Sequence, residues 1–163
     1  MSKIIINSKI QAEVFMTYLY TKMLLNVSYN EAEVKERIEA AVGKPYPLRD
    51  RWKMGGVGSS KLLISATSTD IHNLLILDNN RNTCNVELRP KGIILRFRSL
   101  LETYALIIPY YKLTLYKGKA EEYSIYKDQQ FVKIVAETMG IHKFFSKISA
   151  EKAKNQAPGI EDL

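Results

Sequence analysis

The sequence predicts an α+β fold in which N-terminal helices precede an antiparallel sheet and a last helix packs on that sheet. Three observations predict it. Apolar residues recur at helical spacing before residue 43, alternate as in strands after residue 61, and return to helical spacing after residue 137. Only a few residues join the later strands, whereas parallel pairing would need crossovers of about a dozen. We therefore expect a mainly antiparallel β meander.

Two helices are expected first, at residues 8–26 and from residue 30 onward. Ser8-Lys9-Ile10-Gln11 has the spacing of a capping box, and the apolar residues after it cover a broad helix face. Asn30-Glu31-Ala32-Glu33 has the same spacing. Gly43 suits the position just past the end of the second helix.

Residues 44–61 are rich in proline, glycine and serine, so we expect a linker or mobile loop without regular structure. The glycines do not form a phosphate loop, because the Gly-Lys-Ser/Thr order is absent and a strand is predicted to follow. The dinucleotide fingerprint fails as well, because Lys61 stands where its third glycine belongs.

Strands are predicted from residue 62 onward. The expected ranges are 62–67, 74–77, 84–89, 93–98, 104–108, 113–117, 122–126 and 131–136. A tight hairpin is expected at Arg89-Pro90-Lys91-Gly92. After it, Ile93, Leu95 and Phe97 face one way, and the residues between them form the solvated face of a half-buried sheet.

The last helix is expected to begin near Glu137. Its apolar stripe has helical spacing and comprises Ile141, Phe144, Phe145 and Ile148. We divide the chain into a helical segment with its linker at residues 1–60, a β domain with its C-terminal helix at residues 61–150, and a flexible tail at residues 151–163.

Composition narrows the functional classes. Apolar residues make up 46% of the 163, which is ordinary for a globular protein, and 24 Lys or Arg against 17 Asp or Glu give a charge of +7. A lone cysteine, Cys84, excludes an intrachain disulfide and an all-cysteine zinc site. The apolar runs are too short for a secretory signal or a transmembrane helix, so a cytoplasmic protein is expected.

The residues of the sequence give little support for a catalytic or metal site. Cys84 could pair with His72 or His142, but its apolar strand neighbours favour a buried structural thiol. Asp70 and His72 could share a strand face, yet they lack a third metal ligand. We expect a non-enzymatic protein with no cofactor, no catalytic residues and no metal site, and a Cys/His enzyme is the alternative.

The positive charge gathers in the strands, where residues 81–136 carry ten Lys or Arg against five Asp or Glu. Six tyrosines lie among them: Tyr104, Tyr110, Tyr111, Tyr116, Tyr123 and Tyr126. A basic, tyrosine-rich strand face could stack the bases of a single strand, although no RNA-recognition signature is present. Nucleic-acid binding is therefore an alternative function, against a solvated basic face.

Residues 84–147 resemble the bacterial pleckstrin-homology-like and GRAM-like domains. The resemblance lies in Gly92-Ile93-Ile94-Leu95-Arg96-Phe97, in Ile107-Ile108-Pro109-Tyr110-Tyr111-Lys112-Leu113 and in Phe131-Val132-Lys133-Ile134. It implies a bent sheet or small barrel capped by the last helix, a fold used mainly for binding. The two N-terminal helices lie outside the resemblance.

Some such domains hold phosphoinositides through a lysine followed by a basic-x-Arg pair, and Lys91, Arg96 and Arg98 match that spacing. We therefore expect a binding or interaction module for an anionic ligand or a protein partner. The basic residues predicted for an anionic site are Arg89, Lys91, Arg96, Arg98, Lys112, Lys117 and Lys119. Exposed strand edges would also allow a homodimer.

Overall fold

The computed structural model describes residues 23–79, 81–119 and 121–156. Residues 8–22 of the helix predicted at 8–26 and residues 157–163 of the predicted tail lie outside these ranges. Residues Leu24–Asn26, expected at the end of that helix, instead form strand β1. This strand pairs with β5 (Glu102–Pro109), where Leu24 lies opposite Leu106, 82 residues later. Local spacing favoured a helix there, but pairing across the sheet determines the conformation.

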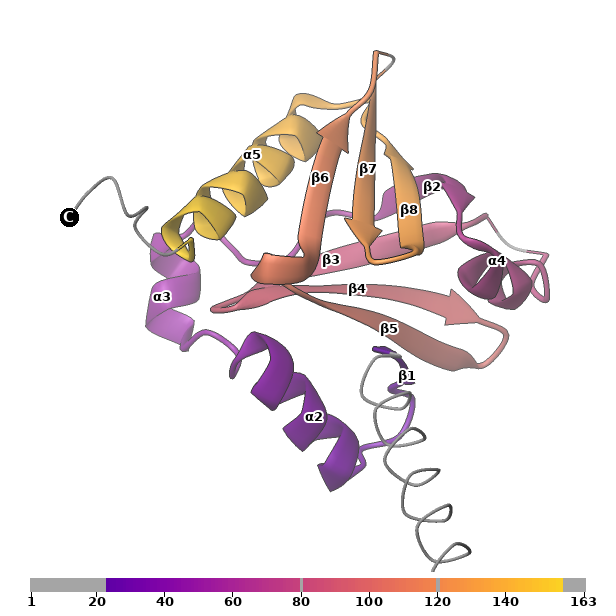
Figure 1. Cartoon of the computed structure of the whole chain (residues 1–163), viewed down its shortest axis with the longest axis horizontal. Helices are drawn as coiled ribbons and strands as arrows, with labels where there is room; N and C mark the ends of the chain where they lie inside the picture. The colour runs from indigo at the N-terminus through magenta and orange to yellow at the C-terminus, as the bar shows by residue number, and fades with distance from the viewer. Residues whose placement is uncertain (1–22, 80, 120, 157–163) are drawn as a thin grey trace, which may run out of the picture.

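The described strands form one antiparallel sheet in the order β1-β5-β4-β3-β2-β8-β7-β6 (Figure 1). After β1 they are β2 Leu62–Thr67, β3 Thr83–Arg89, β4 Gly92–Ser99, β5 Glu102–Pro109, β6 Leu113–Lys117, β7 Glu122–Lys127 and β8 Gln130–Val135. The helices are α2 Ala32–Val42, α3 Leu48–Lys53, α4 Thr69–Leu75 and α5 Met139–Lys154, with a 3-10 turn η1 at Tyr110–Lys112. The predicted α+β class with a C-terminal capping helix is confirmed.

The main core lies inside the bend of this sheet. Strands β2–β5 form one meander and β6–β8 a second, and β2 joins them because it pairs with both β3 and β8. Helix α5 covers the open side with its predicted stripe, of which Phe145 and Ile148 are at most 1% exposed. Thr138 caps the start of α5, and the helix continues to Lys154, past the point where the tail was expected to begin.

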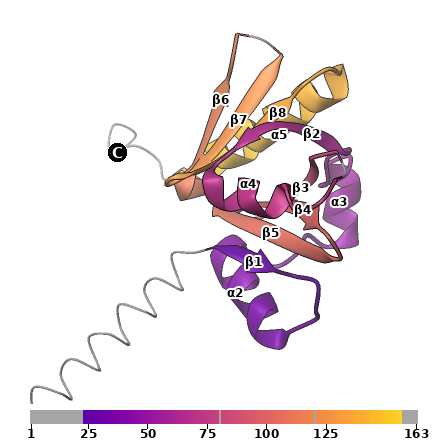
Figure 2. The ribbon, with the colours of Figure 1, turned by 90° about the vertical axis from the view of Figure 1, so that its right-hand side faces the viewer.

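A second layer covers the other face of β4 and β5, and this corrects the expected solvated face. Ile94, Ala105 and Ile107 are fully buried there, together with Leu25 and Val42. Figures 1 and 2 show α2 packed below β5, opposite the second meander. The alternating apolar residues after residue 92 predicted one buried face of the sheet. Alternation within a strand does not show that a distant helix, here α2, covers the opposite face.

Three local predictions need correction. Residues 74–77, expected as a strand, form the end of α4 and the turn after it, and Ile71 and Leu75 bury one face of this helix. Helix α2 begins after Glu31 without a side-chain cap, so the Asn30 capping box does not form. Within the predicted linker, α3 begins after Pro47, whose carbonyl accepts hydrogen bonds from the Asp50 and Arg51 N–H groups.

The glycine-rich part of this linker is also ordered against β3. Gly58 forms a bridge with Glu87, the Leu88 N–H donates to the Val57 carbonyl, and the Ser59 N–H donates to the Val86 carbonyl. Residues 57–59 therefore run along β3 as a short extension of the sheet, and the expectation of a mobile loop is wrong at these positions.

Gly92 lies where the sheet and α2 approach closely. A Cβ at this position would collide with the Ile108 carbonyl oxygen and lie 2.6 Å from Val42 Cγ1 and 2.8 Å from Pro109 Cα. We expect Gly92→Ala to lower the free energy of unfolding by about 1–3 kcal/mol, measured by urea denaturation. Gly58→Ala is the control, because nothing lies within 4 Å of its Cβ. Equal stability of the two variants would contradict this account.

Candidate functional site

The seven predicted basic residues do not gather on one surface. Arg89 and Arg96 share one ion-pair network, whereas the other five lie apart from it. Arg98 is exposed and donates to the Leu100 carbonyl. Lys112 is the last residue of η1, and its Nζ lies 3.5 Å from Asp128 Oδ2. Lys91 is in the β3–β4 turn, and Lys117 and Lys119 lie in or beside the β6–β7 hairpin.

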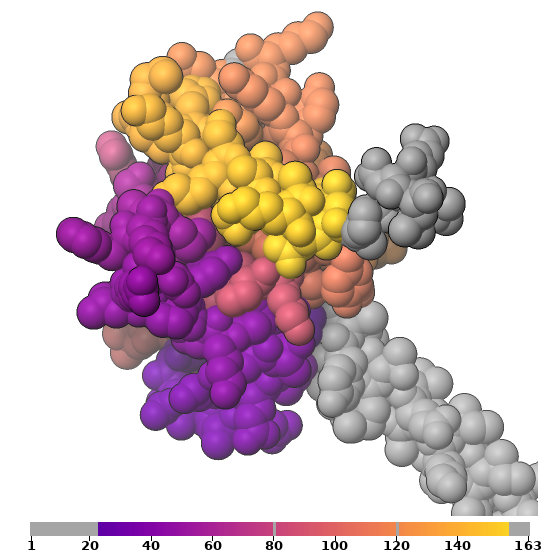
Figure 3. Space-filling model, turned by 90° about the vertical axis from the view of Figure 1, so that its left-hand side faces the viewer, coloured from indigo at the N-terminus to yellow at the C-terminus, as the bar shows by residue number. Residues whose placement is uncertain are grey.

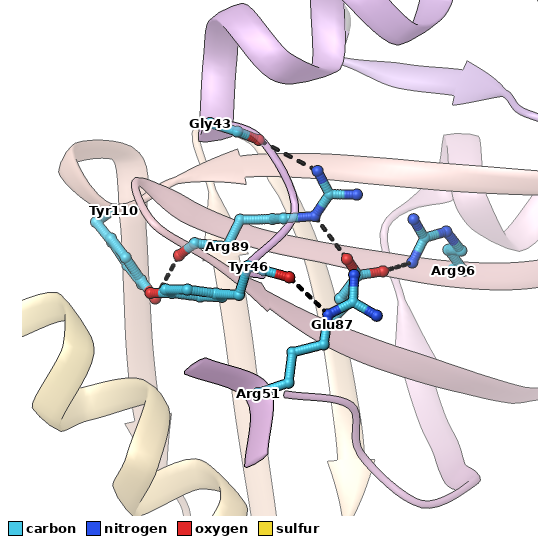
Figure 4. Close-up of polar contacts among 7 residues, drawn as sticks. All are labelled: Gly43, Tyr46, Arg51, Glu87, Arg89, Arg96 and Tyr110. Atoms are coloured by element: carbon cyan, nitrogen blue, oxygen red, sulfur yellow. Dashed lines mark hydrogen bonds and ion pairs between the residues drawn. The ribbon is translucent and has the colours of Figure 1, made fainter. Parts of the chain in front are cut away.

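The network is built on Glu87, whose carboxylate lies between two guanidinium groups. Arg89 Nε donates to Glu87 Oε1 at 2.6 Å, and Arg96 Nη1 donates to Glu87 Oε2 at 2.5 Å. Figure 4 shows the two arginines approaching the carboxylate from different sides. All three side chains project from the face of β3 and β4 that carries Ile94, directly opposite Glu87 in the sheet register.

Backbone carbonyls and a tyrosine fix the surroundings of Arg89. Arg89 Nη1 donates to the carbonyl of Gly43, the residue that ends α2 with φ +85°. Tyr110, 3% exposed, donates its hydroxyl to the Arg89 carbonyl at 3.2 Å. Burial raises the pKa of Tyr110, so the hydroxyl keeps its proton and remains a donor. Helix α2 and η1 therefore position Arg89 together.

We call the hollow beside this network the arginine depression. It has a volume of about 450 Å³ and lies between the segment after α2 and strands β3 and β4. Its polar lining includes Arg51, Ser59, Asn85, Glu87, Arg89 and Arg96. The three arginines and one glutamate give it a formal charge of +2. A second hollow of about 310 Å³ lies on the other side of Arg89 and Arg96, beneath the start of α2.

Sequence reasoning missed Arg51, Ser59, Asn85 and Glu87. A signal existed for two of them, because Asn85 and Glu87 alternate with buried residues on β3 and so share a face with Arg89. No comparable signal existed for Arg51, which lies in the segment expected to be irregular. Its Nε donates to the Tyr46 carbonyl at 2.8 Å, and this contact holds it at the rim (Figure 4).

Glu87 is ionised in this setting. Burial alone would raise the pKa of its carboxyl, but the charges of Arg96 and Arg89 and their hydrogen bonds hold that pKa below its usual value. The carboxylate thereby neutralises one of the two guanidinium groups that contact it, and the second keeps its charge.

Most of the six tyrosines do not form a stacking surface. Tyr123 stacks on Phe145 with 4.2 Å between ring centroids, and Tyr104 stacks on Phe97 at 5.9 Å. Tyr126 lies against Phe131, and Tyr110 is buried. Tyr111 and Tyr116 are exposed at 83% and 60%. The platform expected for base stacking is thus largely packed against the rest of the fold.

Cys84 and His142 pack within the fold, whereas His72 is exposed. Cys84 is 1% exposed in the main core, and burial raises the pKa of its thiol to about 12. His142 Nδ1 lies 3.0 Å from the Tyr123 hydroxyl, and His72 belongs to α4. No hydrogen bond joins Cys84 to either histidine among the described residues. Asp70 accepts hydrogen bonds from Ser68 and Gln130.

Within the described ranges, no group of three or more His, Cys, Asp or Glu has the arrangement of a metal site. A search of the helices in the same ranges finds none with the length and apolar character needed to span a membrane. Comparisons of the chain with protein-family models, with curated proteins and with solved structures find no match.

The Glu87 network should make stability depend on pH. Because the folded-state pKa of Glu87 is lowered, its contribution is complete above the ordinary glutamate pKa and disappears as pH falls through the folded value. We expect Glu87→Gln to cost about 1–3 kcal/mol at pH 7 in urea denaturation. The gap between wild type and variant should close below about pH 4. A gap that stays constant with pH would contradict an ionised Glu87.

The Cys84 thiol should be unreactive toward thiol reagents in the folded protein. A thiol with a raised pKa and almost no exposure supplies little thiolate for reaction. We expect negligible reaction with Ellman's reagent at pH 8 in native buffer and complete reaction of one thiol per chain in denaturant. Rapid labelling of the native protein would contradict the burial of Cys84.

Proposed function

We propose that this protein is a non-enzymatic binding module with a pleckstrin-homology-like architecture, and that the arginine depression takes the anionic group of its ligand. The observation that carries this proposal is the excess of guanidinium over carboxylate at one hollow. Arg51, Arg89 and Arg96 line it with Glu87, so one carboxylate faces three arginines. Two joined meanders with a capping helix agree with the architecture that the resemblance implies.

The arginines have donors to spare. A guanidinium has five N–H donors, and the contacts found among the described residues use two of Arg89, one of Arg96 and one of Arg51. Planar arginine forks match phosphate and carboxylate oxygens with paired hydrogen bonds. The hydrogen bonds to Glu87, Gly43 and Tyr46 fix the forks before a ligand arrives, which lowers the entropic cost of binding.

The size of the hollow limits the ligand. A volume of about 450 Å³ lies in the range of small-molecule sites and fits one anionic group with part of the molecule that carries it. A phosphate ester or a carboxylate on a larger molecule has this chemistry. The described lining holds no histidine or cysteine, and the Ser59 hydroxyl donates to the Ser60 carbonyl. These features favour binding over nucleophilic chemistry.

Phenyl phosphate and inorganic phosphate are suitable probes, with binding followed by amide chemical shifts of the full chain. We expect shifts at Ser59, Asn85 and Glu87. Arg96→Gln should weaken phenyl phosphate binding by about tenfold, because it removes a charge-assisted contact. Arg98→Gln is the matched control, since Arg98 follows on the same strand face but does not line the depression.

Two results would overturn the proposal. Equal affinity of the Arg96→Gln and Arg98→Gln variants would show that the depression does not hold the anion. Binding of a single-stranded oligonucleotide with a steep loss on added salt, and with shifts centred on Tyr111 and Tyr116, would instead favour the nucleic-acid alternative.

A further inference from the structure

Helix α3 is held in place although it adds nothing to the core. None of its six residues, all of them described, is buried. Its C-terminal end forms a Schellman motif in which the N–H groups of Gly55 and Gly56 donate to carbonyls of the last turn. Lys147 of α5 donates to the carbonyl oxygens of Met54 and Gly56 at 2.8 and 3.0 Å. Packing therefore does not explain why this short helix is fixed.

The outer face of α3 is apolar and open. Leu48 and Trp52 lie one helical turn apart and are 83% and 88% exposed. They belong to what we call the α3 patch, an open depression of about 840 Å³ lined by Leu48, Arg49, Arg51, Trp52, Gly55 and Gly56. In Figure 3 the purple segment that includes α3 lies at the edge of the molecule, between α2 and the yellow part of α5.

The charge around the α3 patch is strongly positive. Residues 44–61 carry five Lys or Arg and one Asp, so their formal charge is 5 − 1 = +4. Arg49 and Arg51 lie directly beside the apolar surface. Charge complementarity therefore favours an acidic ligand at the α3 patch. The exposed side chains of Leu48 and Trp52 favour a ligand that also carries large apolar side chains.

The residue types point to a protein chain as that occupant. Tryptophan and arginine are the side chains that most often dominate protein interfaces. Gly55 and Gly56, with φ +68° and +91°, form a wall without side chains, and nothing lies within 4 Å of a Cβ built on either. Another backbone can therefore approach closely. A second copy of this chain would bring the same positive charge against the patch, which disfavours self-association.

We propose that the α3 patch is a docking site for an acidic segment of a partner protein, with apolar side chains seated against Leu48 and Trp52 and carboxylates paired with Arg49 and the neighbouring cations. This site is additional to the proposed anion site. Arg51 alone among the described residues lines both hollows, so tests of docking use Leu48 and Arg49.

An unbiased test is selection of a displayed random-peptide library against the full-length protein. We expect enriched peptides that combine Asp or Glu with Leu, Ile, Phe or Trp. Because Trp52 is the only tryptophan in the chain, an enriched peptide without tryptophan should shift the fluorescence of Trp52 to shorter wavelength as it covers the indole. The titration gives the affinity directly.

Two variants in the patch and two controls test where the peptide binds. Leu48→Ser and Arg49→Glu should each weaken peptide binding by about tenfold or more, as for interface hot spots. Met139→Ser is the matched control, since Met139 is 71% exposed but lies at the start of α5, away from the patch. Arg96→Gln should also leave peptide binding unchanged, which separates docking from the proposed anion site. Thermal denaturation checks that all variants are folded.

The proposal would be overturned by a selection that enriches no acidic, apolar peptides, or by peptides that bind the Leu48→Ser variant as tightly as wild type. Trp52 emission that already indicates a buried indole in the isolated protein would show that the chain covers the patch itself. A shift that grows with protein concentration would identify a second copy. A shift with vesicles containing phosphatidylglycerol, together with no peptide binding, would identify a membrane surface.

Discussion

Strand β4 buries both of its faces, and the rest of the architecture follows from this constraint. Ile93, Ile94 and Leu95 are consecutive and fully buried, so apolar layers must cover the sheet on opposite sides. The second meander and α5 supply one layer, and α2 supplies the other, where it packs beside Leu25 of the edge strand β1. Gly92, at the start of the same strand, lets α2 come close enough to seal the second layer.

The position of α2 in turn places the candidate site. Its last turn packs Val42 against the sheet, and the chain then turns at Gly43, whose carbonyl accepts a hydrogen bond from Arg89. The polar network therefore begins where the apolar contact between α2 and β4 ends. Glu87 and Arg96 lie at this boundary, partly shielded from water, where charge pairs are stronger than on an open surface.

The spacing of apolar residues correctly predicted elements whose own pattern matches their conformation. Examples are β3, the β3–β4 hairpin and the buried stripe of α5. These patterns failed where packing against residues distant in the sequence determines whether a segment is a helix or a strand. Leu74 to Leu77 is as apolar as a strand, but Ile71 and Leu75 bury one face of a helix. The basic residues of the proposed anion site were predicted from charge and from the family resemblance. These signals identified Arg89 and Arg96 but not Glu87, because pairing geometry is not visible in a count of charges.

The place of β2 between the two meanders has a consequence for folding. Its pairing with β3 closes about twenty residues, whereas its pairing with β8 joins Leu63 to Val135 across 72 residues. Contacts so distant in sequence form slowly, because a long loop must close first. During synthesis the last strand of the first meander, which ends at Pro109, precedes β8, which begins at Gln130. Until β8 pairs with β2, this strand presents an unpaired edge to other chains, which makes it the point where misassembly would begin.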